Sequence, residues 1–86
     1  MLHDMPATIR VLLFARYAEL FGADHLDLAG RPGMTVSDVV SPIRQLPGGD
    51  GLPSRPLCAL NLRQAEGTEP VAAGDEVALL PPLAGG

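Results

Sequence analysis

The feature that most constrains the fold is a pair of strand-like segments near the two ends of the chain. Residues 8–14 (TIRVLLF) and residues 77–80 (VALL) are short, apolar and rich in β-branched or large aliphatic side chains, which favours strands. A chain of 86 residues is long enough for one domain. We therefore expect a single domain in which the first and last strands can pair in parallel at the centre of one sheet.

The composition requires an aliphatic core without covalent support. Apolar residues make up 47% of the chain but aromatic residues only 3%. Cys58 is the only cysteine, so an intrachain disulfide and a multi-cysteine metal site are both excluded. No apolar run approaches the roughly 18 to 20 residues that span a bilayer, and residues 1–6 lack the features of a signal peptide. We expect a cytoplasmic protein stabilised by packing, with no membrane contact.

The charge pattern limits the partners. The net charge of −4 argues against nucleic acid as a ligand, and it favours a basic partner or a basic active site on another protein. All six basic residues are arginines. Without lysine, the chain has no ε-amine for an isopeptide, a Schiff base or a P-loop phosphate contact.

The remaining segments complete an α+β layout, a mixed sheet packed on one main helix. The prolines and glycines of residues 47–56 predict a mobile loop. The expected elements are a short helix over 15–21 ended by Gly22, a strand over 25–29, the main helix over 36–46, a strand over 57–61 and a weak strand over 62–64.

The main helix has a clear start and an ambiguous end. Thr35 and Asp38 fit a capping box. Pro42 would either kink the helix or end it. The residues expected on its apolar face are Val36, Val39, Val40, Ile43 and Leu46.

Alternation along the two terminal strands assigns their faces. Ile9, Val11 and Leu13 face the core with Val77 and Leu79. Arg10, Leu12 and Phe14 lie on the opposite face, as do Ala78 and Leu80. A face with Leu12 and Phe14 is covered either by a partner or by a loop of the chain.

No group of residues inside the chain has a catalytic spacing. His3 and His25 are far apart and are interpreted as surface residues, and Cys58 as a core residue without a nearby base. Asp75 and Glu76 point to opposite faces of a strand and indicate either turn chemistry or partner docking. The sequence thus leaves the C-terminal group as the reactive candidate.

The last residues form a narrow, stiff segment that ends in the C-terminal carboxylate. Pro81 and Pro82 favour an extended chain, and Gly85-Gly86 can enter a channel too narrow for a side chain. The alternative is a terminal glycine pair without function. An α-carboxylate with a pKa of about 3.5 is ionised at neutral pH and is a poor electrophile. It needs activation, for example as an adenylate, and another protein must supply the nucleotide site.

The two ends together resemble the small subunit of molybdopterin synthase, a family with the ubiquitin-like β-grasp fold. The matching residues are Val11 to Arg16 with Glu19, Leu20 and Gly22, then Asn61, then Gly74 to Val77 and Pro81-Pro82 to Gly85-Gly86. The resemblance spans most of residues 8–86. It implies a single β-grasp domain over 8–82, a flexible arm over 1–7 and an extended Gly-Gly tail over 83–86. Leu79-Leu80 stands where the family often has an aromatic pair.

The resemblance also implies a mechanism and partners. An E1-like adenylyltransferase uses ATP to adenylate Gly86, and a sulfur donor protein converts the adenylate to a thiocarboxylate. The carrier itself binds no cofactor. Its tail, with Gly85 as a slim stalk, enters the large subunit of the synthase in a heterotetramer, where sulfur passes to cyclic pyranopterin monophosphate. The residues expected at the partner interface are Leu12, Phe14, Leu80, Pro81 and Pro82.

Other functions fit the same tail. A ubiquitin-like modifier would form an isopeptide with a lysine on a target protein. A sulfur carrier for thiamine or another thio-product would use the same thiocarboxylate, although Pro-Pro before Gly-Gly favours the molybdopterin family. A simple interaction domain would leave the Gly-Gly end unused.

Overall fold

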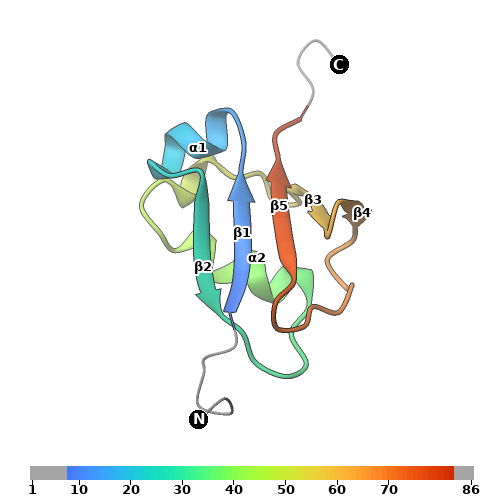
Figure 1. The fold of residues 1–86 in the computed structure, drawn as a ribbon. Coiled ribbons are helices and arrows are strands. Elements are labelled where there is room, and N and C mark those ends of the chain that lie inside the picture. Colours follow the sequence, from blue (N-terminus) through green and yellow to red (C-terminus); the bar gives the residue numbers. More distant parts are fainter. Residues whose placement is uncertain (1–7, 83–86) are drawn as a thin grey trace.

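A five-stranded mixed sheet forms the centre of the molecule, as a computed structural model shows for residues 8–82 (Figure 1). The strands are β1 (Thr8–Leu13), β2 (His25–Ala29), β3 (Leu57–Leu60), β4 (Arg63–Ala65) and β5 (Glu76–Leu80). Their order is β2-β1-β5-β3-β4. β1 and β5 pair in parallel, with Val11 opposite Val77, while the other neighbouring strands are antiparallel. The predicted central pairing of the two terminal strands is confirmed.

The main helix α2 (Val36–Arg44) lies behind the sheet in Figure 1, which confirms the predicted α+β layout. Its capping box is formed. The Asp38 backbone N–H donates to Thr35 Oγ1 at 3.4 Å, and the Thr35 N–H donates to Asp38 Oδ2 at 2.9 Å. These two bonds satisfy orphan donors at the helix start.

The core lies between α2 and the sheet and is almost entirely aliphatic. Valines and isoleucine from α2 pack against the predicted inward residues of β1 and β5. The exposed fraction is at most 2% for Ile9, Val11, Leu13, Val77 and Leu79. The face assignment of both strands is thus confirmed.

The end of α2 differs from the prediction because of Pro42. A proline has no N–H to donate to the carbonyl four residues earlier, and α2 ends two residues later, at Arg44. The chain then tightens, since the Leu46 N–H donates to the Ile43 carbonyl three residues back. Leu46 is 39% exposed, so its predicted place on the buried face is wrong.

The segment over 47–56, which the sequence predicts as a mobile loop, is packed against the short helix α1 (Arg16–Phe21). It contains a 3₁₀ turn, η2 (Gly49–Gly51), and Leu52 belongs to the core. Gly48 has a φ of 97°, and a Cβ there would lie 2.5 Å from the Leu20 carbonyl oxygen. The glycines thus allow a close approach to α1 as well as breaking the helix.

The arm over 1–7 and the tail over 83–86 lie outside the described residues.

Candidate functional site

The sheet has an outer face, turned away from α2, and an apolar patch crosses the centre of it. Between residues 8 and 82, no helix lies over this face (Figure 1). Leu12 of β1 and Ala59 of β3 both pair with Ala78 of β5, and Leu57 of β3 pairs with Leu80. Cross-strand neighbours on one face are in contact distance, so these side chains form one surface.

The patch continues to the end of β5 from which the tail departs. Phe14 follows Leu13, which pairs with Leu79, and this register places Phe14 level with Leu80. Phe14 is 45% exposed and Leu57 is 42% exposed. We call the set Leu12, Phe14, Leu57, Ala59, Ala78, Leu80 and Pro81 the apolar patch.

Most predicted interface residues are at this patch. Leu12, Leu80 and Pro81 are half-buried, and Pro82 is exposed at the end of the described chain. Ala78 belongs to the outer face as expected, but it is only 8% exposed, because its short methyl group lies on the central strand between Leu12 of β1 and Ala59 of β3. Gly85 and Gly86 fall outside the described residues.

Leu57 is a patch residue that was not expected at the partner interface from the sequence. The signal was its alternation with the core residue Cys58, which assigns Leu57 to the outer face. The pairing of β3 with β5 could not be read from that segment alone.

A strained turn holds Phe14 at the edge of the patch. The Tyr17 N–H donates to the Phe14 carbonyl at 3.0 Å, which closes a turn with Ala15 in its second position. Ala15 has φ 50° and ψ −124°, the conformation of a type II′ turn that glycine normally occupies. This turn ends β1 at Leu13, one residue before the predicted end, and begins α1 at Arg16.

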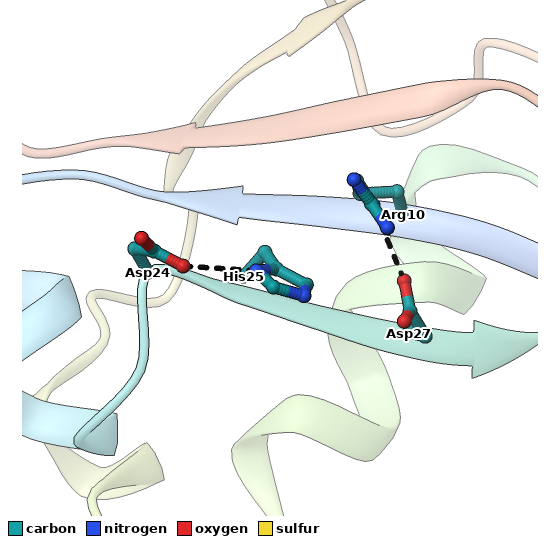
Figure 2. Close-up of polar contacts among 4 residues, drawn as sticks. All are labelled: Arg10, Asp24, His25 and Asp27. Atoms are coloured by element: carbon teal, nitrogen blue, oxygen red, sulfur yellow. Dashed lines mark hydrogen bonds and ion pairs between the residues drawn. The ribbon is translucent and has the colours of Figure 1, made fainter.

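Charged side chains border the patch on β1 and β2 (Figure 2). The Arg10 Nε donates to Asp27 Oδ1 at 3.4 Å, and His25 Nδ1 lies 2.8 Å from Asp24 Oδ1. Both pairs are largely exposed, so they add little to stability. Together with Glu76, which is opposite Arg10, the carboxylates outnumber the single arginine. This border suits a partner with basic residues around an apolar centre.

A turn network fixes the start of β5. Asn61 donates from its amide nitrogen to Asp75 Oδ1 at 3.1 Å, and its amide oxygen accepts from the Glu76 N–H at 3.0 Å. The Asp75 carboxylate accepts hydrogen bonds from the Ala72 N–H and from the Asn61 side chain. Both bonds hold the pKa of Asp75 below its ordinary value, and the bond from Ala72 has the larger effect. Asp75 therefore has the turn role that the sequence left open, and Asn61 joins the β3–β4 turn to β5.

The interior of the described chain offers no nucleophile or metal centre. Residues 8–82 contain no group of three or more histidine, cysteine or acidic side chains placed to hold a metal ion. Cys58 is 4% exposed, and burial raises the pKa of its thiol, which disfavours the thiolate. The predicted core position of Cys58 is confirmed.

Among residues 8–82, no helix has the length and apolar character to cross a membrane.

Comparison with known proteins agrees with this geometry. Residues 11–86 match the ThiS family. The solved structure of SAMP1 from Haloferax volcanii is similar, with 30% sequence identity and a TM-score of 0.77; the match covers 92% of this chain and 99% of that chain. No curated protein matches.

Two further solved structures support the fold. The putative molybdopterin converting factor subunit 1 from Pyrococcus furiosus has 23% identity and a TM-score of 0.76, with 90% of this chain and 99% of that chain covered. A chain from the complex of subunits 1 and 2 of molybdopterin-converting factor from Helicobacter pylori has 19% identity and a TM-score of 0.69, with 92% and 99% covered. The expected ubiquitin-like β-grasp is confirmed.

Proposed function

The chain belongs to the ThiS family of ubiquitin-like sulfur carriers, and we propose that it carries sulfur for molybdopterin synthesis. In this proposal it is the small subunit of molybdopterin synthase, and the catalytic side chains belong to the large subunit. The observation that supports the proposal best is the exposed apolar patch, which runs to Pro81 at the base of the tail.

The proposed chemistry takes place at the Gly86 carboxylate. Its oxygen attacks the α-phosphate of ATP in an E1-like adenylyltransferase, and diphosphate leaves. A sulfur donor protein then supplies sulfur at the sulfide level, and this sulfur displaces AMP to give a terminal thiocarboxylate. In the large subunit the thiocarboxylate sulfur bonds to cyclic pyranopterin monophosphate, and water hydrolyses the bond between that sulfur and the Gly86 carbonyl carbon, so that the carrier returns to the carboxylate. Two such rounds build the dithiolene.

The described residues have three roles in this cycle. The apolar patch docks the carrier, its acidic border orients it, and Pro81-Pro82 directs the tail toward the partner. The Asn61–Asp75 network and the β1–β5 pairing make a firm base, so that the tail leaves a fixed strand. The similar Helicobacter pylori chain is found in a protein–protein complex of subunits 1 and 2, which supports a large-subunit partner here.

The patch can be tested with two leucines of similar chemistry. Leu57→Asp places a carboxylate in the patch, whereas Leu62→Asp changes an 88% exposed leucine in the β3–β4 turn, at the other end of β3. We expect Leu57→Asp to weaken large-subunit binding at least about tenfold, since a charge buried in an interface is costly. Leu62→Asp should leave the affinity unchanged. Equal affinities of the two variants, measured by calorimetry, would refute docking through the patch.

The tail has its own test. Deleting Gly86, or adding one residue after it, should abolish sulfur transfer and leave the unfolding curve unchanged. Molybdopterin formation by the extended protein, without trimming, would refute the proposed role of Gly86.

A ubiquitin-like modifier is the second candidate, because the similar Haloferax volcanii protein is named a small archaeal modifier protein. The chain has no lysine, so an isopeptide could form only with another protein's lysine. Covalent conjugates of the tail on cellular proteins would favour this candidate. Thiocarboxylate formation without conjugates would favour sulfur carriage, and a loss of the sulfur-containing thiazole part of thiamine in cells without the chain would indicate the thiamine branch instead.

A further inference from the structure

A groove of about 630 Å³ lies between α2 and the edge of the sheet formed by β3 and β4, and its lining reaches the apolar patch at Leu57. Leu57 and Ala65 contribute accessible apolar lining, and the buried side chains of Val36, Val40 and Cys58 lie beneath them. Small-molecule sites usually have volumes of about 300–1,000 Å³, mostly apolar walls and a few polar groups. The groove is therefore of suitable size for a small ligand.

Two arginines line the groove without a carboxylate partner. Arg44 ends α2, and Arg55 precedes β3. Among residues 8–82, the ion pairs involve Arg10 and His25 but neither of these arginines.

Arg44 is held in place and still has free donors. Its Nη2 donates to the Ser54 carbonyl at 2.8 Å, and the residue is half-buried. A guanidinium has five N–H donors, and this bond uses one of them. Burial raises the pKa of the Cys58 thiol, and the Arg44 charge partly opposes that rise, which indicates that the arginine's field reaches the apolar lining.

Hydroxyl groups and one carboxylate complete the lining. Ser37 and Ser41 of α2 and Thr68 are hydrogen-bonding groups of the groove, and Glu66 is its acidic residue. Two arginines and one glutamate give the lining a net positive charge. Arginine and hydroxyl donors together fit the oxygens of a phosphate group, because the planar guanidinium can donate two parallel bonds.

We propose that this groove binds a small phosphate ester, with the phosphate between Arg44 and Arg55 and the body of the ligand over Leu57 and Ala65. The groove shares Leu57 with the apolar patch, so a bound ligand and a docked partner would contact the same residue. The proposal does not depend on sulfur carriage.

The test is an NMR titration of the ¹⁵N-labelled full chain at constant ionic strength, with inorganic phosphate, AMP and adenosine as separate probes. Phosphate should shift the amide signals of Ser41, Arg44 and Arg55 in a saturable way, with millimolar affinity. AMP should bind at least about threefold more tightly than phosphate, since its body covers the apolar lining. Adenosine should cause no saturable shift at these residues.

Variants that change one charge test whether the groove itself binds the phosphate. The native Arg55 side chain makes no hydrogen bond with residues 8–82. Arg55→Gln should therefore weaken phosphate binding about tenfold, which is the effect of losing one charge-assisted hydrogen bond. Glu66→Gln should strengthen it. Arg31→Gln removes the same charge outside the groove and should have little effect.

Three results would overturn the proposal. One is the absence of saturable shifts at Ser41, Arg44 and Arg55 with phosphate up to about 20 mM, well above a millimolar dissociation constant. Another is an equal loss of affinity in Arg31→Gln and Arg55→Gln, which would indicate nonspecific charge attraction. AMP binding no more tightly than phosphate would refute the ester and leave an anion site alone.

Discussion

Replacing Ala15 with glycine should stabilise the protein, although an alanine-to-glycine change normally has the opposite effect. Ala15 has φ 50° and ψ −124°, and an L-residue held in such a sparsely populated region costs about 1–3 kcal/mol. Glycine adopts this conformation freely but raises the entropy of the unfolded chain, which costs about 0.4–1 kcal/mol. The difference favours glycine by about 1 kcal/mol.

The assay is reversible unfolding by urea and by heat. A gain of about 1 kcal/mol should raise the melting temperature by about 4–8 °C in a domain of this size. Ala73→Gly is the matched control, because Ala73 is exposed and does not have a positive φ. It should lose about 0.5–1 kcal/mol. Ala15→Val should lose stability, since a β-branched side chain tolerates this region least.

A loss in Ala15→Gly as large as in Ala73→Gly would refute the strained turn. The result bears on function, because this turn ends β1 and sets the position of Phe14 beside Leu80. Ala15→Gly should also let Phe14 move more freely, and it should therefore weaken partner binding even while it stabilises the free carrier.

Three further predictions follow from single residues. Tyr17 is 1% exposed, and its hydroxyl has no hydrogen-bond partner among residues 8–82, so Tyr17→Phe should raise the free energy of unfolding by about 1 kcal/mol; a loss of that size would indicate a hidden partner. Gly48→Ala should cost more than about 2 kcal/mol, because it combines a positive φ with a clash against α1; a thermal melt equal to wild type would contradict the packing of η2. The hydrogen bonds from Ala72 and Asn61 lower the pKa of Asp75 in the folded protein below its ordinary value of 3.8. These bonds therefore stabilise the fold fully above pH 3.8, and the stabilisation is lost as the pH falls through the lower pKa of the folded protein. Stability measured from pH 5 downward should therefore fall less steeply in Asp75→Asn, and identical slopes would show that the carboxylate has no such role.

The sequence predicted the elements that depend on local signals. Thr35 and Asp38 marked the start of α2, Gly22 marked the end of α1, and alternation assigned the buried faces of β1 and β5. The parallel pairing of β1 with β5 followed from their places at the two ends of a small domain.

Features that depend on tertiary contacts were not predictable in the same way. Ala15 and Leu62 have positive φ, yet neither residue type signals that conformation. The packing of η2 against α1 is a long-range contact, and its glycines looked like ordinary loop residues. Of the residues expected at the partner interface, Leu12, Phe14, Leu80 and Pro81 lie in the apolar patch. Leu57 and Ala59 were not expected there, because their neighbours on β5 are known only from the β3–β5 register.

The central claim is that Gly86 carries sulfur. The most direct test is an intact-mass spectrum of the full chain after incubation with its activating enzyme, ATP and a sulfur source. We expect a mass increase equal to the exchange of one oxygen for one sulfur, located at Gly86 by fragmentation and absent when ATP is omitted. An unchanged mass, with an activating enzyme proven competent on another carrier, would contradict the account.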